Sequence, residues 1–291
     1  MFSLIAAVNT QKSFATGEFE VSPMNQKISL VPGERTYGTF KITNPGTSTN
    51  DFAFELSIEP FTVDENYEIK FENNGDYNQI VDWITLDYKG GVISPNNTAI
   101  IGFYIDTPSD APAGGQYASI LVKTIQNEAS AEDGINLHHN FSIAHVLYAD
   151  VAGETVRKGT VNHIEVPSFL FSGQITGSAS ITNDGNVHSD GTYIMQIYPL
   201  FSSEELYTNE EAPLTNTILP GSTRSTAIRW DDTPLVGVFH VVYTASFEGV
   251  ENKVDKIVIV CPLWLLFLII LAIFLLIFRI MTGKRKQDEK K

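Results

Sequence analysis

Residues 52–59 read FAFELSIE, and this short stretch decides the fold class of the chain. Its large apolar residues alternate with smaller or charged ones, and they are Phe52, Phe54, Leu56 and Ile58. An alternation of period two is typical of a β-strand with one face in a core and the other in water. The same rhythm recurs in residues 141–147 and 239–247.

Residues with turn chemistry separate these runs. They are Pro32-Gly33, Asn44-Pro45-Gly46, Pro112-Ala113-Gly114-Gly115 and Asp184-Gly185-Asn186. Proline presets one corner of a tight turn and glycine accepts the positive φ that other residues resist. Short strands separated by such turns favour an antiparallel sandwich.

The sequence also repeats itself. Residues 38–46 read GTFKITNPG and residues 177–185 read GSASITNDG. Two further echoes follow in the same order, ISPNNT at 93–98 with ILPGST at 218–223, and PAGGQY at 112–117 with PLVGVF at 234–239. Because three matches keep one order, we predict two tandem Ig-like antiparallel β-sandwiches, over residues 16–152 and 153–256.

A run of 22 residues without charge, Ile257 to Phe278, precedes a basic C-terminus. About 20 apolar residues in a helix match the ~30 Å hydrocarbon core of a bilayer. We expect a single transmembrane helix over residues 257–280 and a basic cytoplasmic tail over residues 281–291, with the rest outside the cell. A buried core helix is the alternative.

The N-terminus has features of a secretion signal. Residues 2–8 are apolar, and Ser13-Phe14-Ala15 places small residues where signal peptidase requires them. We expect a truncated signal peptide over residues 1–15; the alternative is export that relies on the C-terminal helix. The chain has one cysteine, Cys261, and extracellular eukaryotic domains of this type usually carry disulfides, so a bacterial envelope is the better setting.

Charge is unevenly distributed. The ectodomain, residues 16–256, holds 12 of the 19 Lys and Arg residues and 32 of the 34 Asp and Glu residues, a net charge of −20. Such a charge repels nucleic acid and anionic lipid and keeps a domain soluble. It could also attract divalent cations or a basic partner.

Catalytic and metal-binding motifs are missing from the sequence. It has no Gly-x-Ser-x-Gly, Walker or His-Glu-x-x-His motif. His139 and His145 would lie roughly 20 Å apart along a strand, too far for one zinc ion. Asp184-Gly185-Asn186 lacks the spacing of an EF-hand. We expect no enzymatic activity, no metal site and no cofactor, and whether calcium binds stays open.

One long segment suits ligand binding. About 24 residues between Ile58 and Trp83 are rich in Asn, Asp, Glu and Tyr. Long loops without a function are uncommon, and tyrosine with amides suits a sugar or a peptide. The candidate ligand contacts are Tyr67, Asn73, Asn74, Tyr77 and Asn78. The alternative is a solvated hairpin excursion.

Several motifs together resemble a known family. They are Pro23-Met24-Asn25-Gln26, Leu30 to Glu34, Ile42-Thr43-Asn44, Ala111 to Tyr117, Thr182 to His188, Leu219 to Arg224, and Trp230. In this respect the chain resembles the WxL-interacting surface proteins of Gram-positive bacteria. The resemblance implies a peptidoglycan-binding domain, a second Ig-like domain and a transmembrane anchor.

The functional hypothesis is therefore a non-enzymatic, membrane-anchored protein of the Gram-positive cell surface. Its Ig-like domains would bind peptidoglycan or other surface proteins, as in adhesion. The alternative is a structural spacer or assembly scaffold without carbohydrate binding. Strand edges allow either version to add a partner strand.

Overall fold

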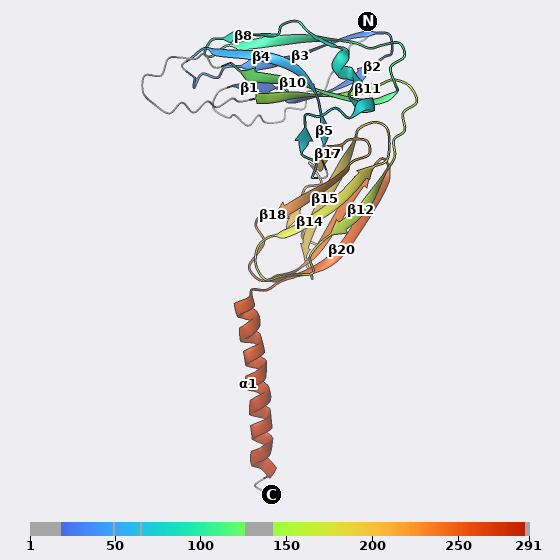
Figure 1. Ribbon diagram of the computed structural model, residues 1–291. Coiled ribbons are helices and arrows are strands. Elements are labelled where there is room, and N and C mark those ends of the chain that lie inside the picture. Colours follow the sequence, from blue (N-terminus) through green and yellow to red (C-terminus); the bar gives the residue numbers. More distant parts are fainter. Residues whose placement is uncertain (1–18, 49, 65, 126–141, 289–291) are drawn as a thin grey trace. The chain divides into compact units, whose positions relative to one another are not determined.

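The computed structural model describes residues 19–48, 50–64, 66–125 and 142–288, with side chains as far as Arg279 (Figure 1). The chain divides into two compact units. Unit 1 consists of Met1–Arg157, Gly185–His188 and Leu219–Ser222, and unit 2 of Lys158–Asp184, Ser189–Ile218 and Thr223–Lys291. The expected signal peptide, residues 1–15, lies outside the described residues.

Unit 1 is built from strands and two short 3₁₀ helices. They are β1 (Glu20–Ser22), β2 (Asn25–Leu30), β3 (Arg35–Thr43), β4 (Phe52–Pro60), β5 (Thr62–Val63), β6 (Ile69–Lys70), η1 (Gly75–Tyr77), η2 (Gln79–Asp82), β7 (Ile84–Leu86), β8 (Gly90–Ile93), β9 (Thr98–Asp106), β10 (Gly114–Thr124) and β11 (Ser142–Val151). The alternating stretch 52–59 is thus a strand, as its pattern predicts.

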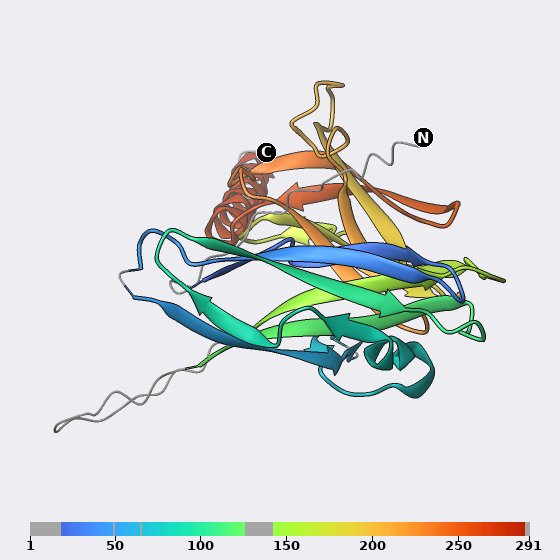
Figure 2. The ribbon, with the colours of Figure 1, turned by 90° about the horizontal axis from the view of Figure 1, so that it is seen from above.

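Two sheets form the sandwich of unit 1. The first has the order β1-β3-β9-β7 and the second the order β2-β11-β10-β4-β8, and their long strands run across Figure 2. The N-terminal segment joins both sheets, since β1 pairs with β3 whereas β2 pairs in parallel with β11. The other pairings among these strands are antiparallel.

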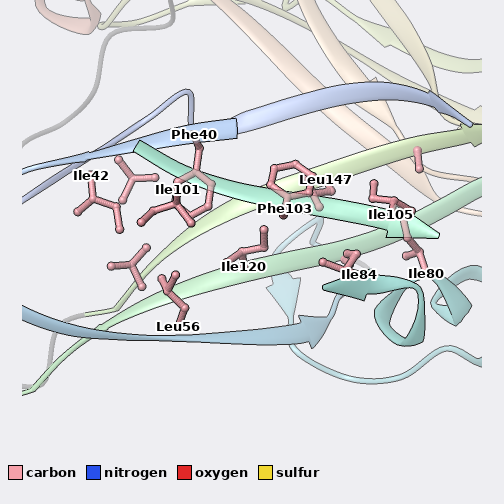
Figure 3. Close-up of a cluster of buried hydrophobic side chains, with 14 of the residues drawn as sticks. Phe40, Ile42, Leu56, Ile80, Ile84, Ile101, Phe103, Ile105, Ile120 and Leu147 are labelled. Atoms are coloured by element: carbon pink, nitrogen blue, oxygen red, sulfur yellow. The ribbon is translucent and has the colours of Figure 1, made fainter. Parts of the chain in front are cut away.

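The core of unit 1 lies between the two sheets. Figure 3 shows Phe40 and Phe103 from the first sheet facing Leu56, Ile120 and Leu147 from the second. These side chains are almost wholly removed from water. Alternation along each strand places them, because every second side chain points to the same face.

Unit 2 is a second sandwich followed by a helix. Its elements are β12 (Gly159–Glu165), β13 (Phe169–Leu170), β14 (Ile175–Asn183), β15 (Ser189–Pro199), β16 (Tyr207–Thr208), β17 (Leu214–Ile218), β18 (Thr223–Trp230), β19 (Gly237–Phe247), β20 (Val250–Val260) and α1 (Leu263–Asp288). One sheet has the order β12-β14-β18; the other runs β13-β20-β19-β15-β16, with β17 also on β15. The structure confirms the predicted Ig-like β-sandwich fold, although not the transmembrane helix that was predicted to follow it.

The predicted transmembrane helix is wrong. Residues 257–260, expected to begin it, belong to β20, and the side chains of Val258 and Val260 are buried against unit 2. Cys261 and Pro262 end the strand, so the helix begins only at Leu263. Across the residues that the structure describes, no helix has both the length and the apolar character needed to cross a membrane.

Candidate functional site

The predicted ligand loop in unit 1 is an ordered segment that covers the outer face of β10 and β11. Phe61 is buried, and its ring lies 5.9 Å from Tyr117 and 5.7 Å from Tyr148, both in edge-to-face contact. Asn78 is 3% exposed, and its side-chain amide donates to the carbonyl oxygens of Phe61 at 3.0 Å and Tyr117 at 2.7 Å. Asn78 therefore holds the segment in place.

Two of the predicted tyrosine contacts are partly buried. Tyr67 has a positive φ of 61°, and its hydroxyl accepts a hydrogen bond from the backbone N–H of Leu219 at 2.8 Å. A bulky residue keeps this backbone conformation when its surroundings impose it. Tyr77 lies 6.3 Å from Tyr117, ring to ring. Both side chains face the protein more than the solvent.

Asn73 and Asn74 are exposed. The side-chain oxygen of Asn73 accepts the N–H of Gly75 at 2.8 Å, and the backbone N–H of Asn74 donates to Asn78 Oδ1 at 2.7 Å. A hollow of about 110 Å³ beside them is lined by residues that include Phe61, Tyr77 and Tyr117. That volume is below the ~300–1,000 Å³ of ordinary ligand pockets. Their role as ligand contacts stays a prediction.

A larger hollow lies in unit 2. Its volume is about 530 Å³, within the range of ligand pockets. Its lining comes from the turn after β13, the turn after β18, the end of β20 and the start of α1: Phe171, Ser172, Gly173, Thr233, Pro234, Leu235, Val260, Pro262, Leu263 and Trp264. The lining is mainly apolar, and Leu235 is 79% exposed.

An exposed apolar strip continues from this hollow across the sheet. The ring centroids of Phe171, at the hollow, and Phe169 are 4.7 Å apart. Phe169 is the cross-strand partner of Ile259, and Ile259 is also the cross-strand partner of Val238. These four side chains are exposed by 37–47%. The inward residues of the same strands already fill the core, so the strip needs an external partner to leave water.

Polar and acidic groups border the strip. His240 Nε2 lies 2.5 Å from Asp255 Oδ1, and Tyr198 donates its hydroxyl to Glu205 at 3.0 Å. Desolvation and the Glu205 carboxylate raise the pKa of Tyr198, which stays a neutral donor. Asp231 and Asp232, directly before Thr233 of the hollow, are exposed.

The sequence patterns did not predict this surface, because Ile257 and Ile259 fall in the run assigned to a transmembrane helix. The signal that could have found it is the alternation in KVDKIVIV, residues 253–260. Within the described residues, no cluster of three His, Cys, Asp or Glu side chains could hold a metal ion. His145 lies in the core, and His138 and His139 lie outside the described residues.

Comparison with known proteins gives no family. No family model and no curated protein matches the chain. Among solved structures it is similar to the class 5 fimbriae chaperone CfaA, with 11% identity, 84% of this chain and 100% of that chain covered, and a TM-score of 0.39. The E. coli chaperone DraB matches at 10% identity over 82% and 97% of the two chains, with a TM-score of 0.39.

A third match is the Salmonella enterica SafA pilin in complex with the SafB chaperone, at 10% identity over 86% and 99% of the chains, with a TM-score of 0.38. At such identities and TM-scores these matches carry no argument about what this chain binds. The predicted resemblance to WxL-interacting surface proteins is wrong: no family model, of that family or of another, matches the chain.

The functional hypothesis changes with that correction. A membrane-anchored, peptidoglycan-binding surface protein of Gram-positive bacteria is contradicted, since no family model supports the family and no helix in the described part of the chain suits a bilayer. The single-pass membrane location fails for the same reason. Peptidoglycan and cell-surface partners are withdrawn with it.

Proposed function

We propose that the chain is a non-enzymatic protein that binds an extended polypeptide through unit 2. The observation that carries the proposal is the 530 Å³ apolar hollow and the strip of Phe169, Val238 and Ile259 that continues it. Contiguous apolar surface at a sheet face is typical of protein contact sites. The two sandwich domains, residues 16–152 and 153–256, are part of this proposal.

The shape of the surface favours a polypeptide over a small molecule. A hollow lined by Phe171, Leu235 and Trp264 can hold one or two anchor side chains, and buried apolar anchors supply most of the affinity at protein interfaces. The strip beyond it is open and follows neighbouring strands, so it suits a chain that lies across them. A small ligand enclosed in the hollow would leave the apolar strip exposed to solvent.

Charge defines the partner further. The exposed carboxylates of Asp231 and Asp232 lie beside the hollow, and Glu205 lies beside Tyr198 at the far border. The chain as a whole has a formal charge of −15. A segment that alternates apolar and basic residues would complement both features.

The loop of unit 1 supplies a proposed second contact surface. Asn73 and Asn74 would touch the ligand there, while Tyr67, Tyr77 and Asn78 hold the loop. Paired Asn73→Ala and Asn74→Ala changes should weaken binding if this surface takes part. Unchanged affinity would remove the loop from the proposal and leave the hollow.

The test uses the full chain and a synthetic 12-residue peptide of alternating Leu and Lys, with a Leu and Glu peptide for comparison. Trp264 is 63% exposed at the hollow, whereas Trp83 and Trp230 are buried, so tryptophan fluorescence reports on the hollow. We expect the basic peptide to shift the emission and Leu235→Ser or Phe171→Ser to weaken its binding about tenfold.

The matched control is Val92→Ser, which changes an apolar side chain that is 66% exposed in unit 1. It should leave peptide affinity unchanged. Equal weakening by all three substitutions, or equal binding of the acidic peptide, would overturn the proposed function.

A further inference from the structure

The outer face of the first sheet of unit 1 carries a pair of tyrosines that the proposed function does not use. Tyr37 on β3 and Tyr104 on β9 are direct cross-strand partners, with ring centroids 4.9 Å apart and planes at 43°. Tyr37 is 55% exposed. Neighbouring side chains on each strand, Phe40, Phe103 and Ile105, point inward, so the tyrosines stand on the solvent side.

A fixed ion pair borders the tyrosines. Arg35 donates from Nε and a terminal nitrogen to the two carboxylate oxygens of Asp106, at 2.5 and 3.0 Å. The guanidinium carbon of Arg35 lies 5.3 Å from the ring centroid of Tyr104. The hydrogen bond from Arg35 lowers the pKa of Asp106, so the pair is held in its charged, planar form.

Gly102 on β9 lies beside the side chain of Tyr37. It lies on the outer face, between Ile100 and Tyr104, and a Cβ at this position would overlap the carboxylate of Asp87 and the hydroxyl of Tyr37. The absence of a side chain therefore lets one carboxylate and one phenol converge above the sheet. The result is an aromatic surface with hydrogen-bonding groups at its edge.

We propose that this surface binds a neutral hexopyranose unit of a glycan. The apolar face of a sugar ring lies flat on an aromatic ring, and the Asp87 carboxylate and Tyr37 hydroxyl are placed to bond sugar hydroxyls at its rim. Beside the tyrosines, Arg35 and Asp106 neutralise each other as an ion pair, and the Asp87 carboxylate is left as an acceptor of hydrogen bonds. An acceptor without a neighbouring free cation favours a ligand that offers neutral hydroxyl donors over an anionic one.

Titration of the full chain with glucan and mannan hexasaccharides, followed by calorimetry, tests the proposal. We expect one of these neutral glycans to bind and Tyr37→Ala to weaken binding about tenfold. Gly102→Ala should abolish binding, because its Cβ displaces Asp87 and Tyr37. Tyr37→Phe, which keeps the ring and loses the hydroxyl, should have an intermediate effect.

Two controls keep the outcome interpretable. Thermal unfolding of each variant shows whether the sheet is intact, and Tyr37→Phe carries the test if Tyr37→Ala unfolds. Leu235→Ser should leave glycan binding unchanged, which separates this site from the peptide surface of unit 2. No binding of any hexasaccharide at millimolar concentration, or equal binding by Gly102→Ala, would overturn the inference.

Discussion

The side-chain amide of Asn44 donates a hydrogen bond to the carbonyl oxygen of Ile93 across 2.8 Å, deep in unit 1. Unit 2 has the same bond, from Asn183 to the carbonyl of Ile218 across 2.9 Å. Asn44 and Asn183 occupy the same position of the repeat, in TNPG (43–46) and TNDG (182–185). The carbonyl groups that accept these bonds belong to Ile93 and Ile218, the first residues of the next repeated motif, ISPNNT and ILPGST. A second bond also recurs, Thr43 with Thr98 at 2.9 Å and Thr182 with Thr223 at 2.6 Å.

Replacing either asparagine should therefore destabilise its own unit. Asn44→Ala or Asn183→Ala leaves a buried carbonyl without its donor, at a cost of about 1–3 kcal/mol. Urea denaturation of the full chain measures the loss. The exposed Asn73→Ala is the control and should change stability by less than about 0.5 kcal/mol; a similar loss in all three would contradict the assignment.

Stability should fall between about pH 6.5 and pH 4 because of His145. Its ring stacks on Phe40 at 4.6 Å, Nδ1 lies 2.7 Å from the carbonyl oxygen of Pro23, and burial lowers its pKa to about 4. The unfolded chain binds a proton in this range and the folded chain does not, so stability is fullest above pH 6.5. The loss is at most ~1.4 kcal/mol per pH unit.

His145→Leu isolates that contribution, because carboxylates titrate in both proteins. The unfolding free energy of wild type should fall relative to that of the variant as the pH falls from 6.5 to 4. Parallel pH profiles would mean that the pKa of His145 is the same in the folded and the unfolded chain.

Gly38 and Gly177 should resist substitution. A Cβ at Gly38 would overlap the ring of Phe103, and one at Gly177 would overlap the ring of Tyr243. Alanine at either position should destabilise by about 1–3 kcal/mol, the usual effect of overpacking. Gly91→Ala is the matched control, since its Cβ would lie 3.5 Å from Phe54, an ordinary contact. Calorimetry of thermal unfolding measures the stability of the three variants and shows whether only the first two are destabilised.

Asn78→Ala should release the loop of unit 1 without unfolding the sandwich. It removes both bonds to Phe61 and Tyr117, so backbone amides in residues 61–83 should exchange hydrogen faster while β10 and β11 stay protected. Hydrogen exchange followed by mass spectrometry measures these rates, and Asn74→Ala is the variant for comparison. Protection in 61–83 that survives Asn78→Ala would show that the aromatic contacts alone hold the loop.

The strands could be predicted from the sequence because alternation reports directly on which face is buried, as Phe52 to Pro60 shows. The apolar run from Ile257 gave a wrong prediction, since the length of a run does not reveal that Val258 and Val260 are buried in the core of unit 2. Composition located the long loop correctly. It could not show that Asn78 is buried, because its partners are backbone carbonyls far along the chain.

The tyrosine pair was beyond the reach of sequence patterns for a related reason. Tyr37 and Tyr104 become neighbours only through the register of β3 with β9, and neither stands in a recognisable motif. Gly102 reads as an ordinary strand glycine until the two side chains above it are seen. Both proposed binding surfaces depend on the pairing of strands that lie far apart in the sequence.

The parallel pairing of β2 with β11 sets an order of events in folding. Asn25 is opposite Val146, so a strand made early in synthesis has its partner only after almost all of unit 1 has emerged. Contacts between distant parts of a chain form slowly, since the intervening loop must close first. The backbone edge of β2 therefore stays unpaired while the remaining strands assemble, and the growing chain is most open to foreign strands during that interval.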